Sequence, residues 1–255
     1  MTSATAHPAP SEIAPPASKP SVARPSASGA SYDDLPLLMT RMTGDEKHEP
    51  SATSTLDVLW VLYHHVLRIS AQHPDDSNRD RFLLSKGHGP MAYFAVLAAR
   101  GFFPVEWLDT FGAFDSPLGL HPDRTLIPGV EISSGSLGHG LPIAVGVVLG
   151  LRASGRRQPH VFCLLGDGEL DEGSNHEAIA LGGRLTLDRL TAIVVDNRSA
   201  SHGWPNGVAQ RFAVEGWSTS TVDGRDHHAL FEALRPRRRN RPHAVVCVVE
   251  PRESR

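Results

Sequence analysis

The chain has 255 residues, of which 40% are hydrophobic, and its 25 lysines and arginines against 28 aspartates and glutamates leave a formal net charge of −3. This length suits one large core, and the weak net charge gives no electrostatic reason to expect nucleic acid or an anionic membrane as a partner. The sequence has no run of about eighteen apolar residues that would predict a membrane span, and its two cysteines lie in apolar runs, which fits a cytoplasmic protein without a disulfide framework.

Composition divides the chain into a tail and a domain. Residues 1–31 are mostly Ala, Pro and Ser, which predicts a disordered extension and leaves 32–255 as one domain. A basic run at 235–243 is expected to be a solvated loop.

Hydrophobic periodicity predicts the elements in chain order. A short amphipathic piece is expected at 32–41, before the first long helix. The helix at 141–155 is expected to be buried and rich in small residues. The predicted helices are 54–69, 91–101, 105–112 and 141–155, with a short strand at 81–85 and a loop-rich stretch at 116–140.

A strand, a crossover helix and a second strand follow at 160–197, and another strand, helix and strand end the chain at 217–250. Crossover connections of this kind pair strands in parallel, with their carboxyl ends at one edge of the sheet. We therefore expect an α/β protein with a doubly wound parallel sheet, helices on both faces, and a ligand site beyond the carboxyl ends of the strands.

Two polar residues end the strands of that first unit. Asp167 stands between Gly166 and Gly168, and Asn197 follows the next strand. Carboxylate and amide oxygens suit Mg²⁺, a backbone carbonyl such as that of Ser199 can add a third ligand, and glycines let the backbone approach a phosphate closely. The pattern predicts a metal-bound diphosphate, whereas the tripeptide Gly-Asp-Gly alone is compatible with a simple turn.

The same stretch resembles the thiamin diphosphate motif, in which Gly-Asp-Gly is followed by Asn some thirty residues later. Further motifs occur in the order and spacing of the N-terminal, diphosphate-binding domain of transketolases, and the resemblance covers about residues 36–250. These motifs are "DRFLLSKGHGP", "GLHPD", "GVEISSGSLGHG", "GDGELDEGSNHEA" and "VDGRDHHAL".

The resemblance implies roles for individual residues. Asp167, Asn197 and the Ser199 carbonyl match ligands of Mg²⁺ (or Ca²⁺), and Gly166 and Gly168 match backbone that contacts the diphosphate. The remaining matches are Gly135 and Leu137, which would lie against the cofactor rings; His88, near the diphosphate and the substrate; His121, near the substrate hydroxyls; His48, at the active-site mouth; and Glu172, an acid at the subunit interface. An exposed histidine in a turn and an acid at a helix N-terminus are the ordinary alternatives for His48 and Glu172.

The sequence also departs from the family pattern. "KHEP" replaces a Gly-His-Pro-Gly loop around His48, His139 stands where Gln is usual, and "SHG" with His202 replaces Ile-Asp-Gly after the Asn. Both histidines are candidates for lining the substrate pocket, so the substrate preference is expected to differ from that of sugar-phosphate transketolases.

The activity implied by the resemblance is transfer of a two-carbon ketol unit, carried as a thiamin diphosphate adduct, from a ketose-type donor to an aldehyde or other acceptor. In that family a Glu on a second, pyrimidine-binding domain activates the cofactor, so we expect this chain to need a separately encoded pyrimidine-domain subunit, in an α2β2 assembly. Two alternatives remain open. One is an α-like subunit of a 2-oxo acid dehydrogenase that passes its two-carbon unit to a lipoyl or carrier protein, and the other is a non-catalytic binding subunit.

Overall fold

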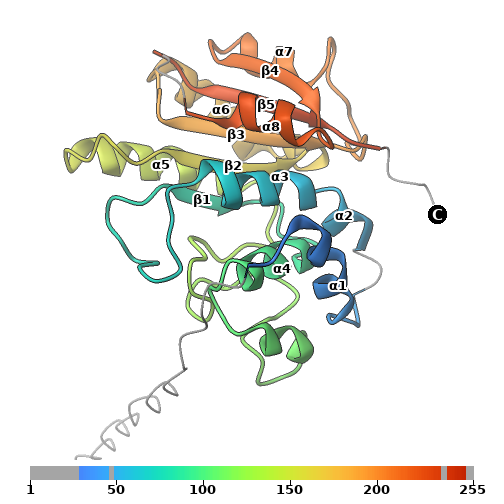
Figure 1. Ribbon diagram of the computed structural model, residues 1–255. Helices are drawn as coiled ribbons and strands as arrows, with labels where there is room; N and C mark the ends of the chain where they lie inside the picture. The colour runs from blue at the N-terminus through green and yellow to red at the C-terminus, as the bar shows by residue number, and fades with distance from the viewer. Residues whose placement is uncertain (1–28, 46–48, 237–239, 251–255) are drawn as a thin grey trace, which may run out of the picture.

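The computed structural model of the protein describes residues 29–45, 49–236 and 240–250 (Figure 1). A five-stranded sheet lies at its centre, with all neighbouring strands parallel and in the order β1-β2-β3-β5-β4. The strands are β1 (Arg81–Leu84), β2 (Val161–Gly166), β3 (Leu190–Asp196), β4 (Ser218–Asp223) and β5 (His243–Val248). The predicted α/β class with a parallel sheet is confirmed.

Helices and helical turns occupy most of the predicted positions. Residues 1–28 of the predicted tail and 237–239 of the basic run lie outside the described residues. In chain order the elements are η1 (Tyr32–Asp34), α1 (Leu35–Thr40), α2 (Glu49–Thr53), α3 (Leu56–Val61), the π-helical turn η3 (Leu62–Val66), α4 (Met91–Ala99), η4 (Val105–Thr110), α5 (Gly140–Ala153), η5 (Gly168–Asp171), α6 (Gly173–Arg184), α7 (Val208–Ala213) and α8 (His227–Leu234).

The sheet separates two hydrophobic cores because successive strand residues point to opposite faces. On β2, Phe162 and Leu164 belong to the core shared with α3, α4 and α8, whereas Cys163 and Leu165 belong to the core shared with α5, α6 and α7. Both faces are therefore covered, which explains why β2 and β3 are almost continuously apolar.

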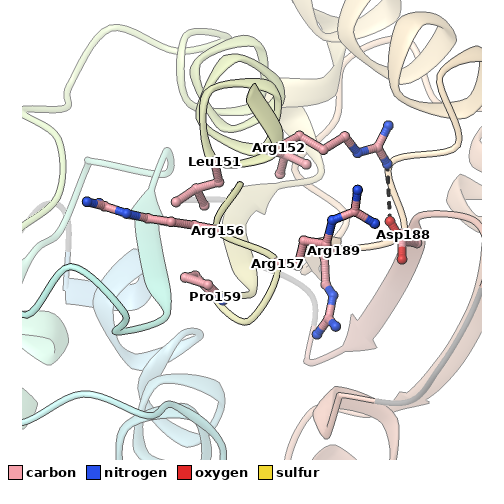
Figure 2. A pocket seen from close by; sticks show the side chains of 8 residues that line it. Leu151, Arg152, Arg156, Arg157, Pro159, Asp188 and Arg189 are labelled. Atoms are coloured by element: carbon pink, nitrogen blue, oxygen red, sulfur yellow. Dashed lines mark hydrogen bonds and ion pairs between the residues drawn. The ribbon is translucent and has the colours of Figure 1, made fainter. Parts of the chain in front are cut away.

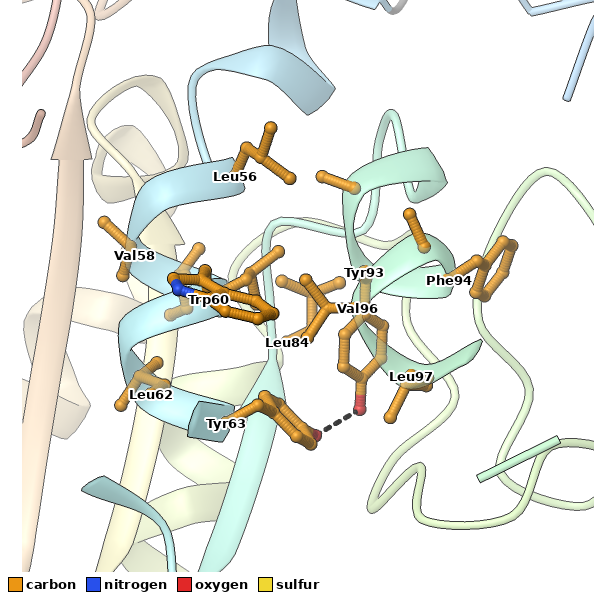
Figure 3. Close-up of a cluster of buried hydrophobic side chains, with 14 of the residues drawn as sticks. Leu56, Val58, Trp60, Leu62, Tyr63, Leu84, Tyr93, Phe94, Val96 and Leu97 are labelled. Atoms are coloured by element: carbon orange, nitrogen blue, oxygen red, sulfur yellow. Dashed lines mark hydrogen bonds between the residues drawn. The ribbon is translucent and has the colours of Figure 1, made fainter. Parts of the chain in front are cut away.

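The first of these cores includes a buried aromatic contact between η3 and α4 (Figure 3). The hydroxyl oxygens of Tyr63 and Tyr93 lie 3.0 Å apart, and the two rings pack at a centroid distance of 5.9 Å. Each phenol thus satisfies its polar end inside an apolar environment. This contact joins two helices that precede and follow β1, and so supports the strand that leads into the "SKGHG" turn.

Helix α5 differs from the prediction of a buried helix. Leu141, Ala144 and Val145 pack on the sheet, but Ile143 remains 42% exposed and Gly146 is also exposed. Small apolar residues surround the helix axis on all sides, so the sequence indicates burial all round, whereas the described residues cover one side only. Within the described ranges no helix is both long enough and apolar enough to span a membrane.

Candidate functional site

The predicted metal ligands lie at the carboxyl ends of neighbouring strands. Gly166 at the end of β2 pairs with Val195 of β3, and the Asp167 amide donates to the Val195 carbonyl at 3.1 Å. Asp167 and Asn197 each follow their strand directly, and both are buried, with 1% and 5% of their surfaces exposed. Parallel pairing in this register is what brings the two side chains to the same edge.

The Asp167 carboxylate is held by the segment that follows Asn197. Its Oδ2 accepts hydrogen bonds from the backbone amides of Ser199 (2.6 Å) and Ala200 (3.0 Å), and its Oδ1 accepts one from the Ser199 hydroxyl (2.6 Å). The two amides fix the orientation of the carboxylate. Because a hydroxyl can rotate, Oδ1 is the oxygen that can exchange its partner for a ligand.

Asn197 provides an unpartnered oxygen beside this carboxylate. Its Oδ1 is buried and makes no hydrogen bond, which is costly unless a ligand satisfies it. No group of three or more His, Cys, Asp or Glu suited to a metal occurs among the residues that the structure describes, so a cation here would depend on amide and backbone oxygens as well as Asp167. That donor set suits Mg²⁺, which binds few protein oxygens and keeps the rest of its sphere for phosphate and water.

The glycines that flank Asp167 lie where side chains would be crowded. A Cβ on Gly168 would lie 3.2 Å from the Ser199 carbonyl oxygen, and one on Gly166 would lie 3.3 Å from Cδ of Lys86. The Ser199 carbonyl, the predicted third ligand, therefore lies beside the turn. The bare backbone of this turn fits a closely approaching diphosphate.

A second group of predicted residues gathers around the loop 134–140. The rings of His88 and His121 lie 5.3 Å apart in an edge-to-face arrangement, and a Cβ on Gly135 would meet the His121 ring at 2.7 Å. Gly87 packs equally closely on the backbone of Gly135, at 2.5 Å from a Cβ position to the amide nitrogen. The structure thus brings together His88, His121 and Gly135, and half-buried Leu137 follows on the same loop.

The remaining predicted residues are exposed or lie outside the described residues. Glu172 is exposed and occupies the N-cap position of α6 without a side-chain capping bond. His139 is the exposed residue before α5, and the backbone amide of exposed His202 donates to Asp171 at 3.4 Å. His48 lies outside the described residues.

Sequence reasoning missed two buried charged residues in these loops. Glu169 is 2% exposed, and burial raises the pKa of its carboxyl group. The Lys86 ammonium donates to the Ser51 carbonyl at 2.8 Å and also to the Ser51 hydroxyl, which joins α2 to the "SKGHG" turn. A charged residue in a turn is usually solvated, so neither position carried a sequence signal for burial.

An arginine-lined cavity of about 340 Å³ lies elsewhere (Figure 2). It is bordered by Arg152 at the end of α5, by Pro159 before β2, and by Asp188 and Arg189 before β3. The cavity therefore lies at the amino ends of the strands, opposite the edge that carries Asp167. None of the predicted site residues lines it.

Comparison with known protein families agrees with a site made from a buried Asp and a buried Asn at adjacent strand ends. The family profile described as "Transketolase, thiamine diphosphate binding domain" matches residues 42–249. The chain belongs to the transketolase family. The resemblance stated from the five motifs is therefore confirmed, including the N-terminal, cofactor-binding part of the family.

Several curated relatives are similar over most of their own length. An apulose-4-phosphate transketolase subunit from Actinobacillus succinogenes is 34% identical over 207 residues, which cover 78% of this chain and 75% of that protein. A 6-deoxy-6-sulfo-D-fructose transketolase subunit, SqwG, from a Clostridium species is 32% identical over 199 residues, covering 75% of this chain and 72% of that protein.

Another relative has a different kind of name. "Ferredoxin fas2" of Rhodococcoides fascians is 59% identical over 225 residues, covering 88% of this chain and 74% of that protein. Iron–sulfur clusters are held mostly by four cysteine thiolates. This transketolase-family chain has two cysteines, and they are buried in the cores on opposite faces of the sheet. The word ferredoxin in the relative's name therefore has no counterpart in these residues.

Solved transketolases share the fold. The transketolase from Leishmania mexicana superposes with a TM-score of 0.69 at 27% identity, covering 81% of this chain and 37% of that one. The Pichia stipitis transketolase in complex with sedoheptulose 7-phosphate gives 0.68 at 25% identity, covering 86% and 36%. This chain thus spans little more than a third of the length of those transketolases.

Proposed function

We propose that this chain is the diphosphate-binding subunit of a two-component transketolase that transfers a two-carbon ketol unit from a ketose-type donor to an aldehyde or other acceptor. The observation that carries this proposal is the buried pair of Asp167 and Asn197, with an unpartnered Asn197 Oδ1, at adjacent strand ends of a transketolase-family chain. Buried polar oxygens usually have partners in folded proteins, so the Asn197 oxygen beside Asp167 is available to a bound cation.

Asp167, Asn197 and the Ser199 carbonyl would hold Mg²⁺ or Ca²⁺, and the backbone of Gly166 and Gly168 would lie against the diphosphate of thiamin diphosphate. The donor set is oxygen only, which suits a hard cation. When bound, the cofactor supplies the carbanion chemistry of the reaction, and the protein's task is to orient it and to exclude competing reactions.

Two histidines near the loop 134–140 are available to a donor sugar in this proposal. His88 is half-buried and His121 is exposed, with their rings in contact, so both can reach a ligand that enters above the loop 134–140. We assign them to orienting donor oxygens and moving protons, a contribution of roughly 10²-fold or more for each general acid or base. We assign His48 to the mouth of the same site, on the family resemblance alone.

A partner subunit belongs to the same proposal. The related apulose-4-phosphate and 6-deoxy-6-sulfo-D-fructose enzymes are named as subunits. In this chain the neighbouring helices α5 and α6 expose Ile143, Leu181 and Leu185. Large apolar side chains exposed on adjacent helices favour a protein contact. We place the pyrimidine-binding subunit against the face of α5 and α6 that carries these side chains, in an α2β2 assembly of the cytoplasm.

The experiment compares the purified chain alone with the chain and the partner recovered together through an affinity tag. Both are supplied with thiamin diphosphate and Mg²⁺ and assayed with ketose and ketose-phosphate donors and a set of aldehyde acceptors. Ketol transfer is expected only from the assembly. Turnover by the chain alone would contradict the need for a partner, and transfer from a 2-oxo acid to a lipoyl group would assign the chain to the dehydrogenase class instead.

A further inference from the structure

Glu169 is a buried carboxylate to which the reaction assigns no role. It lies in the short turn η5 directly after the Gly-Asp-Gly segment, and only 2% of its surface is exposed. Placing an acid in the interior costs free energy unless hydrogen bonds compensate. The contacts of its two oxygens are therefore informative.

Each oxygen of Glu169 holds a different part of the candidate site. Oε1 accepts hydrogen bonds from the Gly138 amide (2.9 Å) and from the Ser85 hydroxyl, and Oε2 accepts one from the Gly166 amide at 3.3 Å. Ser85 in turn accepts a bond from the Gly140 amide at 2.9 Å. One side chain thus connects three segments that lie far apart in sequence.

These three segments are the ones that the proposed function assigns to the cofactor. Ser85 precedes the turn that carries His88, Gly138 lies in the loop with Gly135 and Leu137, and Gly166 begins the diphosphate turn. Groups that contact a cofactor have to be held within a fraction of an ångström. That precision comes from neighbouring residues that pack against these groups and hydrogen-bond to them.

The segments also pack closely against neighbouring side chains. A Cβ on Gly140 would overlap the Ser85 side chain, and a Cβ on Gly138 would lie 2.6 Å from Cβ of Glu172. The Ser174 hydroxyl donates to the Gly138 carbonyl at 2.7 Å, so both polar groups of Gly138 are fixed by side chains. A change in the Glu169 contacts is therefore passed directly to the backbone of the ring-binding loop.

We propose that Glu169 is a positioning residue that sets the spacing between the ring-binding loop 134–140 and the diphosphate turn 166–168, and so determines how tightly thiamin diphosphate is held. This inference rests on the proposed function. It adds a residue that touches neither the cofactor nor the substrate but links the backbone on both sides of the cofactor.

The test uses Glu169→Ala and Glu169→Gln in the assembly of the chain with its partner. Alanine removes all three acceptor contacts, whereas the glutamine oxygen can still accept from Ser85 and Gly138 but its amide nitrogen faces the Gly166 donor. We expect the dissociation constant of thiamin diphosphate with Mg²⁺ to rise about 100-fold in the alanine variant and about tenfold in the glutamine variant, with a smaller change in kcat. Glu106→Ala, an exposed acid on η4, is the matched control and is expected to leave the dissociation constant unchanged.

Amide hydrogen exchange distinguishes positioning from general stability. Faster exchange confined to segments 134–140 and 166–168 of the cofactor-free alanine variant, with partial recovery in the glutamine variant, is the expected result. Uniformly faster exchange across the sheet, or an unchanged dissociation constant in both variants, would overturn the inference. If the wild-type assembly itself binds no thiamin diphosphate, the proposed function fails, and the exchange pattern still reports whether Glu169 joins the loops.

Discussion

His88 and His121 lie next to each other at the candidate site. Their rings are in contact, and Gly135 packs closely against the His121 ring. A neutral imidazole ring carries one hydrogen-bond donor and one acceptor, which suits a group that handles sugar hydroxyls.

We expect His88→Ala to lower kcat of the assembly by about 100-fold, because a positioned acid or base typically contributes that much. His73→Ala, in an exposed turn away from the site, is the control and should have wild-type turnover. Steady-state kinetics with the preferred donor measures both. Equal kcat values for His88→Ala and wild type would remove this histidine from the reaction.

The sequence predicted the juxtaposition of Asp167 and Asn197 because it follows from two apolar strands, a crossover helix and parallel pairing. It did not predict the burial of Glu169 or Lys86. Burial of these groups depends on partners at Ser85, Gly138 and Ser51, which lie far from them along the chain, whereas local pattern describes only near neighbours.

At the scale of the elements, Asp57 of α3 joins parts of the chain that no local pattern connects. Its carboxylate accepts hydrogen bonds from Tyr32 (2.7 Å), Arg225 (2.7 Å) and His227 (2.8 Å), and Arg225 also pairs with Glu250. The network ties η1, α3 and the start of α8 to the residues after β5. The motif "VDGRDHHAL" therefore contributes a structural anchor rather than a described site residue.

Breaking that anchor is expected to cost stability rather than chemistry. Asp57→Ala removes a buried carboxylate and leaves the half-buried Arg225 guanidinium with a missing partner, and we expect the free energy of unfolding to fall by about 3 kcal/mol. Asp109→Ala removes the exposed pair with Arg41 and should cost less than about 1 kcal/mol. Urea unfolding measures the two values, and similar losses in both variants would show that Asp57 has no special structural role.

His160, at the start of β2, gives the sheet a pH dependence. Burial lowers the pKa of His160 to about 4, and its Nε2 lies 2.9 Å from the Thr191 hydroxyl. The folded-state pKa is below the ordinary value of about 6.5, so the neutral ring stabilises the fold above pH 6.5, and this contribution is lost as pH falls towards 4.

We therefore expect His160→Gln to reduce the loss of unfolding free energy between about pH 6.5 and 4 by up to about 3 kcal/mol, because glutamine has no proton to gain. Chemical unfolding of both proteins at several pH values checks this. Parallel stability curves over that range would contradict the assignment.

Two helices could not be predicted fully from the sequence pattern. Helix α7 has six residues and follows Gly207, whose φ of +84° starts it abruptly after a polar loop, so it offers too little periodicity to detect. Helix α5 was predicted as buried because apolar and small residues surround it, but Ile143 and Gly146 face away from the sheet. Which apolar face is covered depends on packing that the sequence of one helix does not describe.

The candidate site lies at one edge of the sheet, and the structural anchor around Asp57 ties together the two ends of the described chain. The exposed apolar residues of α5 and α6 lie on the face opposite to α3 and α8. A molecule built in this way presents a cofactor edge and a separate apolar face, which fits half of an active site completed by another subunit.

The most direct test is the dissociation constant of thiamin diphosphate in the presence of Mg²⁺, measured by calorimetry on the purified assembly with wild type, Asp167→Ala and Asn197→Ala. Asp188→Ala, at the opposite edge of the sheet, is the matched control. The account predicts that affinity falls at least about 100-fold in both site variants and stays at the wild-type value in the control, since loss of an oxygen ligand removes the cation that joins the diphosphate to the protein. Wild-type affinity in Asp167→Ala and Asn197→Ala would contradict it.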